Sequence, residues 1–386
     1  MLDRMAAGEI PPKHHTELRT ASGKLIYEEC LTRRGFDGGY TLLYHQRRPH
    51  EARSVPTSHG WPLPSSGEQR PLARRHFKTF ELPSSGAVAP VDGRVPLLFN
   101  EDVVIAISRA ECEDPAYFSN GDADELLFVH QGTGTLRSVF GDLEYRAGDY
   151  VVVPKGVVHR FIPGSTPSLW LRVECHGGVG LPPAFRNDVG QLRMDAPYCH
   201  RDFRRPRFVG PLDEGLRHVV VKRNGVFHGF EFRASPLDVV GFDGSVYPFA
   251  FPIASFQPKV GAVHLPPTVH ATFQASGALV CSFVPRPLDF GAGAIPCPYP
   301  HSSVDVDEVL FYAGGDFVSR RGISAGSVSH HPAGVPHGPH PGAYEASIGK
   351  KTTDELAVML DCQRPLLHTA SALSIEDAGY HDAFAE

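Results

Sequence analysis

The stretch Gly148-Asp-Tyr-Val-Val-Val-Pro-Lys-Gly-Val-Val-His159 decides the fold of this chain, because the chain contains a second copy of its pattern. Residues 326–337 read Gly-Ser-Val-Ser-His-His-Pro-Ala-Gly-Val-Pro-His, so the same Gly, Pro, Gly and His recur at the same intervals. A second motif precedes each copy: residues 122–128 read Asp-Ala-Asp-Glu-Leu-Leu-Phe, and residues 305–311 read Asp-Val-Asp-Glu-Val-Leu-Phe. Two separated motifs in one order indicate that one structural unit occurs twice.

Short strands and turns surround these motifs. Gly141-Asp142 and Arg223-Asn224-Gly225 each lie between two short apolar runs, which is the turn chemistry of β-hairpins. Long amphipathic helical patterns are scarce, and many short strands between turns are typical of a sandwich or barrel. The expected strands are residues 136–140, 143–145, 151–153, 218–222 and 226–230.

Composition narrows the class of protein. The 386 residues suffice for two or three domains, and 41% hydrophobic residues suffice for a core. The net charge of -6 provides no basic field for nucleic acid, and no run approaches the eighteen apolar residues of a membrane span. Seven dispersed cysteines without a CxxC pair favour reduced thiols and a cytoplasmic protein.

The doubled pattern G-x5-P-x-G-x2-H resembles the second conserved motif of the cupin superfamily, and the resemblance covers roughly residues 100–365. It implies an all-β bicupin with two jelly-roll-like β-barrel lobes. The N-terminal region is expected to be irregular, and its basic, Pro-rich segments either wrap over a neighbouring domain or subunit or lie as solvated loops. We expect this region over residues 1–95, an N-terminal lobe over 96–212, a C-terminal lobe over 213–368 and a tail over 369–386.

Three residues of the C-terminal copy stand where cupins carry their metal ligands: His301, Glu308 and His337. Two imidazoles and one carboxylate hold iron(II) and leave coordination positions open for substrate and dioxygen. The plainer alternative is that both histidines are ordinary polar residues beside turns. The ligand types do not select iron by affinity, since zinc and copper generally bind them more tightly.

The N-terminal copy lacks one of these ligands. A gapless alignment places Glu125 on Glu308 and His159 on His337, but Phe118 falls on the third position. A phenyl ring cannot bind a metal, so we expect one metal per chain, in the C-terminal lobe. The remaining Glu125 and His159 are then expected to hydrogen-bond to each other or to backbone, as buried polar groups must.

Several segments resemble the homogentisate 1,2-dioxygenases, a family of the cupin superfamily. The resemblance implies that iron(II) brings homogentisate and dioxygen together, and that the ring opens to maleylacetoacetate. It also implies a trimer-based homo-oligomer whose binding partners are a small aromatic substrate and O2. The segments are residues 8–13, 39–45, 238–248, 283–287, 300–301 and 331–339.

The resemblance implies two further roles. His264 matches a histidine that acts on the substrate hydroxyl, and His331 matches a histidine that contacts the substrate. Phe317 stands where the family has a tyrosine near the substrate carboxylate, although Arg320 or Arg321 is available as a carboxylate partner. This departure leaves gentisate or a hydroquinone open as the substrate.

Other histidines near the site and other functions stay open. His270, His330 and His340 either act directly or are simply hydrogen-bonded, which is the commoner state of a buried histidine. The competing functions are a gentisate- or hydroquinone-type cupin dioxygenase, a metal-dependent isomerase of this fold, and a cupin that only binds a ligand. A cupin that only binds a ligand does not require a complete set of metal ligands. The C-terminal copy has a complete set.

Overall fold

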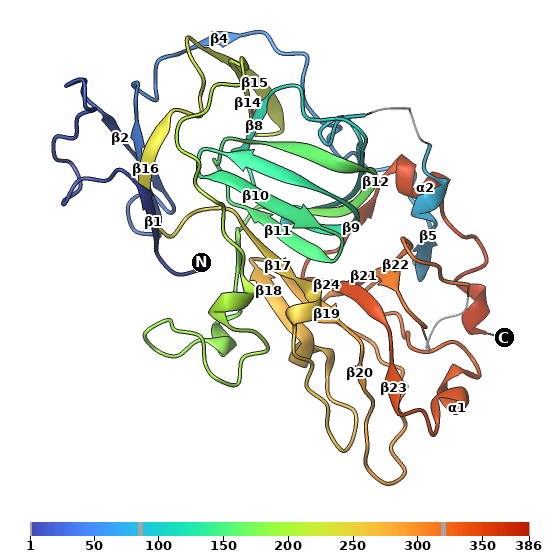
Figure 1. The fold of residues 1–386 in the computed structure, drawn as a ribbon. Coiled ribbons are helices and arrows are strands. Elements are labelled where there is room, and N and C mark those ends of the chain that lie inside the picture. The colour runs from blue at the N-terminus through green and yellow to red at the C-terminus, as the bar shows by residue number, and fades with distance from the viewer. Residues whose placement is uncertain (1, 84–87, 318–321, 386) are drawn as a thin grey trace.

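The computed structural model describes residues 2–83, 88–317 and 322–385, and its regular structure is almost entirely β (Figure 1). The two α-helices of these ranges, α1 (Ala343–Ser347) and α2 (Ala370–Ser374), span five residues each. None of the described helices has the length and apolar character needed to cross a membrane. The expected all-β fold with two cupin lobes is confirmed.

The N-terminal lobe is built on a twelve-stranded sheet, drawn mostly in green in Figure 1. Its strands are β4 (Ala52–Val55), β6 (Arg94–Phe99), β7 (Val103–Ala110), β8 (Tyr117–Asn120), β9 (Asp124–Ser138), β10 (Gly141–Arg146), β11 (Asp149–Val153), β12 (His159–Cys175), β14 (His218–Arg223), β15 (Val226–Phe232), β17 (Phe249–Pro252) and β25 (Leu367–His368). The long strands β9 and β12 are antiparallel neighbours at its centre. The strand expected over residues 151–153 is confirmed as the buried β11.

The C-terminal lobe is built on a seven-stranded sheet in the order β13-β18-β19-β24-β21-β22-β5. Its strands are β5 (Arg75–Phe77), β13 (Val179–Gly180), β18 (Ala271–Ala275), β19 (Ala278–Phe283), β21 (Asp307–Gly314), β22 (Val328–His331) and β24 (Leu356–Cys362). A two-stranded ribbon of β20 (Arg286–Pro287) and β23 (Thr352–Thr353) extends it. The edge strand β5 comes from the N-terminal region, and Figure 1 shows it beside β22 and α2.

The N-terminal region is rich in loops, but its short strands are paired within this chain. β1 (Met5–Gly8), β2 (Tyr27–Thr32) and β3 (Tyr40–His45) form a four-stranded sheet with β16 (Val239–Gly244). β4 pairs with β15, and β5 pairs with β22. The region therefore contributes strands to the sheets of both lobes of its own chain.

The two lobes exchange strands across the expected boundary at residue 212. β14 and β15 follow that boundary in sequence, yet β14 pairs with β8 of the N-terminal lobe, and β17 pairs with β11. In the other direction, β13 pairs with β18 of the C-terminal lobe. A single cut in the sequence does not separate the two sheets, because each lobe completes its sheet with strands from the other.

Equivalent aspartates show the internal duplication directly. Asp124 accepts hydrogen bonds from the backbone N–H groups of Lys155 and Val179, and Asp307 accepts from those of Ala333 and Leu366, all at 2.8 Å. The motif glycines Gly148, Gly156, Gly326 and Gly334 have φ between +78° and +87°, where side chains are rarely tolerated. Each copy therefore builds the same turns with the same residue types.

One hairpin turn differs from its prediction. The strands around residue 140 turn at Val139-Phe140, since Ser138 pairs with Gly141, and Gly141-Asp142 already belongs to β10. Gly141 is required for another reason: a Cβ there would lie 2.2 Å from the backbone oxygen of Arg207. The second predicted hairpin is confirmed, with both turn residues at positive φ as a tight turn requires.

A common hydrophobic core joins the lobes. Phe128 and Phe311 end the two copies of the Asp-x-Asp-Glu motif, and their rings meet edge to face with centroids 6.0 Å apart. Both side chains are buried in one continuous cluster that spans β9, β11, β18 and β21. The two lobes therefore pack against each other through one shared core.

Candidate metal centre

The structure brings His301, Glu308 and His337 together in the C-terminal lobe, as the sequence predicts. Glu308 is the second residue of β21, whereas both histidines lie in loops that meet in a two-residue bridge. In this bridge each backbone N–H donates to the other residue's carbonyl oxygen at 2.8 Å. The same pairing occurs between Phe118 and His159 in the N-terminal lobe, which supports the alignment of the two copies.

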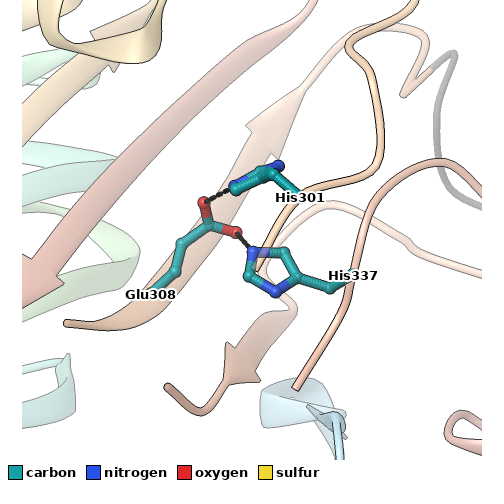
Figure 2. Close-up of side chains that lie close together, drawn as sticks. All are labelled: His301, Glu308 and His337. Atoms are coloured by element: carbon teal, nitrogen blue, oxygen red, sulfur yellow. Dashed lines mark ion pairs between the residues drawn. The ribbon is translucent and has the colours of Figure 1, made fainter. Parts of the chain in front are cut away.

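The side chains converge on one point (Figure 2). The Glu308 Oε2 atom lies 3.9 Å from His301 Nε2, and Glu308 Oε1 lies 3.6 Å from His337 Nε2. One donor atom of each residue lies within 4.8 Å of the others. These distances exceed normal hydrogen bonds and leave room for an ion between the donors.

A divalent metal fits these residues. The His337 Nδ1–H donates to the Val335 carbonyl oxygen at 3.0 Å, which leaves the lone pair of Nε2 directed at the cluster. That Nε2 atom is buried and has no hydrogen-bond partner among the residues that the structure describes, which is costly for a polar atom unless something binds it. A backbone carbonyl on the far nitrogen is the usual support of a metal-binding imidazole.

Burial and two imidazoles set the charge of Glu308. Burial alone would raise the pKa of Glu308, but the neighbouring His331 and His337 outweigh it and hold this pKa well below its usual range. The shortest contact is the hydrogen bond of 2.7 Å between His331 Nδ1 and Glu308 Oε1. The carboxylate is therefore ionised at neutral pH, as a metal ligand must be.

A cavity of about 130 Å³ opens beside the cluster, and His301 and Glu308 line it. His264 also lines it, with Nδ1 3.6 Å from the Asp289 carboxylate. Burial lowers the pKa of His264, while Asp289 acts in the opposite direction. A neutral imidazole held beside a carboxylate can accept a proton from a group bound in the cavity.

His331 does not line this cavity, so its position does not support the substrate contact that the resemblance implies. Its side chain is fully buried, and both of its ring nitrogens are engaged, with Glu308 and with the Tyr380 hydroxyl. The spacing of six residues before His337 matched the family histidine, but β22 turns this side chain toward Glu308, with which it pairs in register. We therefore assign it to the support of the carboxylate.

Of the residues expected at the substrate carboxylate, only Phe317 is described. Phe317 packs against Tyr312, with ring centroids 4.9 Å apart, as part of an apolar cluster next to the cavity. Arg320 and Arg321 lie outside the described residues.

The three histidines whose roles the sequence left undecided have different surroundings. His270 lines the cavity between Phe256 and Phe283, and burial, with Arg286 and His264 nearby, lowers its pKa to about 3. His330 faces the other side of β22, where it contacts Asp307 and His368. His340 packs against Tyr380 and Phe384. Only His270 among them lies where a ligand in the cavity would meet it.

Sequence reasoning missed three polar residues around the centre. Asp289 faces His264, Tyr380 contacts His331, and Asp361 stands opposite Glu308 on β24. Burial and the nearby Glu308 charge raise the pKa of Asp361 to about 7. None belongs to either repeated motif, although Asp361 could have been found as the counterpart of Glu174, which pairs with Glu125 in the other lobe.

In the N-terminal lobe, positive side chains pair with the carboxylate that is equivalent to Glu308. Glu125 pairs with the guanidinium groups of Arg94 and Arg172, and all three side chains are about 3% exposed. His159 donates from Nδ1 to the Val157 carbonyl oxygen, so the expectation of a backbone partner holds for it. The expectation for Glu125 was wrong, because two arginines that the motif comparison did not include supply its partners.

Metal occupancy is expected to fall as the pH drops below neutrality. Because its pKa is lowered, Glu308 stays charged, so the imidazoles are the ligands lost first. They must be neutral to bind a metal, so protons compete with the ion for them as the pH falls. Equilibrium dialysis with Fe²⁺ under argon across this range measures the loss. An occupancy that does not fall at any acid pH at which the protein stays folded would contradict a histidine-held ion.

Comparison with known proteins places the chain among cupins and dioxygenases. Residues 110–174 match the cupin domain family. A protein of Saccharolobus solfataricus named "Putative dioxygenase" is 36% identical over 378 residues, which cover 97% of this chain and 96% of that protein. A solved cupin 2 conserved barrel domain protein from Leptotrichia buccalis is 9% identical, with a TM-score of 0.36 over 76% of this chain and 97% of that one.

More distant relatives are named homogentisate 1,2-dioxygenase. The protein of Bradyrhizobium diazoefficiens is 26% identical over 278 residues, or 68% of this chain. The protein of Nitrobacter hamburgensis is 27% identical over 264 residues, or 64% of this chain. These matches span 61% and 58% of the two relatives, so this chain aligns with about three fifths of their length.

Proposed function

This chain belongs to the cupin-type dioxygenase family of the Saccharolobus solfataricus protein, and from that premise we propose that it cleaves the aromatic ring of homogentisate. In the proposed reaction, dioxygen converts homogentisate (2,5-dihydroxyphenylacetate) to maleylacetoacetate. His301, Glu308 and His337 would hold the iron(II) ion at which this occurs. The names of the more distant relatives support this choice of substrate.

The observation that carries the proposal is the position of the three donors beside a cavity. His301 and Glu308 form part of the cavity wall, so an ion between the donors would be open to a small molecule on that side. Two imidazoles and one carboxylate leave coordination positions free, which is the arrangement of iron(II) oxygenases. When bound, iron(II) supplies a Lewis acid and a redox centre for dioxygen.

Side chains of the cavity suit a phenolic acid. His264 is placed to take the proton of a ring hydroxyl, with Asp289 behind it. Lys259 and Arg286 bring positive charge to the wall, but Arg286 already pairs with Glu355 at 3.0 Å. We therefore propose Lys259, which is exposed, as the partner of the substrate carboxylate.

The second candidate is a dioxygenase that acts on gentisate or a hydroquinone. Phe317 favours it, because this residue adds an apolar ring to the cluster where the resemblance implies a tyrosine hydroxyl. A hydroquinone has no carboxylate and gentisate has a shorter acidic group, so both would need less polar contact on that side. A cupin that only binds a ligand is the third candidate, and it predicts no oxygen consumption.

Oxygen uptake separates these candidates. Apo-protein reconstituted with Fe²⁺ under argon is expected to consume oxygen with homogentisate and to build the absorbance of a ring-opened product. Gentisate and unsubstituted hydroquinone serve as matched substrates that share the para-diol but differ in the acidic side chain. Efficient turnover of gentisate with none of homogentisate would select the second candidate, and no oxygen uptake with any substrate would select the third.

A further inference from the structure

The C-terminal tail reaches the outer side of the candidate metal centre through Tyr380. The Tyr380 hydroxyl lies 3.1 Å from His331 Nε2, and His331 Nδ1 lies 2.7 Å from Glu308 Oε1. Tyr380 is 4% exposed, and the His331 side chain is fully buried. Three side chains from β22, β21 and the tail thus form one buried chain of hydrogen bonds.

The donor and acceptor of each of these hydrogen bonds follow from the chemistry of the three side chains. An ionised carboxylate only accepts hydrogen bonds, so the contact with Glu308 requires the proton of His331 to lie on Nδ1. In the neutral ring Nε2 is then an acceptor, and the Tyr380 hydroxyl donates to it. The tyrosine therefore selects the tautomer of His331 that can hold the carboxylate.

The ring of His331 also lies close to two other rings. It stacks on His337 with centroids 4.7 Å apart and lies parallel to Tyr380 at 6.3 Å. One ring thus contacts two of the three metal-binding candidates, Glu308 and His337. A rotation of His331 would disturb both.

Two ion pairs and a backbone hydrogen bond hold the C-terminal tail in place close to Tyr380. Arg75 of β5 forms an ion pair with Glu376, and Lys78 Nζ lies 3.3 Å from the Asp377 carboxylate. The Asp377 N–H donates to the His76 carbonyl oxygen at 2.8 Å. These contacts lie within five residues of Tyr380 and position it over β22.

The other lobe provides an internal comparison. The residue that pairs with Glu125 in register, as His331 pairs with Glu308, is the buried Val153. A valine cannot hydrogen-bond to a carboxylate, and in that lobe Arg94 and Arg172 hold Glu125 instead. Among the described residues, a histidine that hydrogen-bonds to the carboxylate therefore occurs in the lobe with three potential metal donors and not in the lobe with two such donors.

We propose that Tyr380 is a positioning residue of the metal centre, which acts through His331 to orient the Glu308 carboxylate toward His301 and His337. The inference rests on the proposed function in assuming that these three residues hold a divalent metal. It goes further in making the C-terminal tail part of the centre. Outer partners of this kind commonly change metal affinity by about 10–100-fold.

The test is the affinity of the apo-protein for Co²⁺, measured by competition with a chelator, together with the visible absorption of the bound ion. Tyr380→Phe is expected to weaken binding by roughly 3- to 10-fold, the range of one net hydrogen bond, and to shift the absorption bands. His331→Phe is expected to weaken binding by about 10–100-fold. The double variant is expected to bind as His331→Phe does, because Tyr380 has lost the residue through which it acts.

Tyr117→Phe is the matched control. Tyr117 is another buried tyrosine whose hydroxyl donates a hydrogen bond, but it lies in the other lobe and its acceptor is Glu214. It is expected to leave Co²⁺ affinity and absorption unchanged, and thermal melting of each apo-variant checks folding. Wild-type affinity and absorption in Tyr380→Phe, or additive losses in the double variant, would overturn the proposal. A wild-type protein that binds no Co²⁺ would overturn it together with the metal centre. Binding without oxygen uptake would overturn the proposed function alone.

Discussion

Glu308→Ala is expected to abolish metal binding, so that the content of the purified, reconstituted protein falls from one equivalent per chain to none. Glu308 is the shared neighbour of both histidines, and it supplies the negative charge of the donor set. Without it, two imidazoles face each other with ring centroids 4.4 Å apart and no anion to balance a divalent ion. Elemental analysis after gel filtration measures the loss.

Glu125→Ala is the matched control, because Glu125 is the equivalent carboxylate of the other lobe. It is expected to keep one equivalent of metal, since Arg94 and Arg172 fill that position and Phe118 replaces the third donor. It is also expected to destabilise the fold by roughly 3–5 kcal/mol, the usual cost of leaving a buried charge without its partner. Chemical denaturation of the apo-protein measures this effect.

Either of two outcomes would show that the N-terminal lobe binds a metal. The first is two equivalents in the wild-type protein, and the second is a metal retained after Glu308→Ala. A loss of metal in Glu125→Ala with an unchanged denaturation midpoint would point the same way.

His264→Ala is expected to lower turnover by roughly 10²–10⁴-fold, the usual contribution of a general acid–base group, and to leave the metal content unchanged. His264 lines the cavity on a segment separate from the three donors, and its Nδ1 atom lies 3.6 Å from the Asp289 carboxylate. Its lowered pKa keeps it neutral at neutral pH, so that it can accept a proton. Metal analysis and single-turnover rates are measured on the same preparation.

Asp289→Asn extends this test, because Asp289 raises the pKa of His264 against the effect of burial. Removal of its charge lowers that pKa further, so the acid limb of the turnover profile is expected to move to lower pH. The metal content is expected to stay at the wild-type value. Loss of metal in His264→Ala would instead identify this histidine as a ligand, and unchanged turnover would remove it from the proposed mechanism.

Features that depend on residues close together in the chain could be predicted from the sequence. The repeated glycines mark turns with positive φ, and the repeated aspartates tie those turns to the preceding strand. Because these turns and hydrogen bonds join residues close together in the chain, the glycines and aspartates recur at fixed intervals in the sequence. The duplication and the strands around it could therefore be found by comparing the two copies, and the resemblance to cupins indicated His301, Glu308 and His337.

Features that depend on distant segments could not be predicted in this way. Arg94 lies 31 residues before Glu125 and outside both motifs, yet it pairs with that carboxylate. Tyr380 lies 49 residues after His331, and no spacing in the chain relates them. The boundary at residue 212 failed for the same reason, because strand exchange depends on which edges are free in three dimensions.

The sequence by itself thus determined that the chain has two cupin lobes and that only one of them carries three potential metal ligands. These properties follow from residue type and short-range turn geometry, which act within a dozen residues. Only the tertiary structure decided which groups surround the candidate residues: His331 behind Glu308, Asp289 behind His264, and two arginines beside Glu125. Burial removes water from these groups, so each must find a partner in the protein, and the fold alone determines which partner lies within reach.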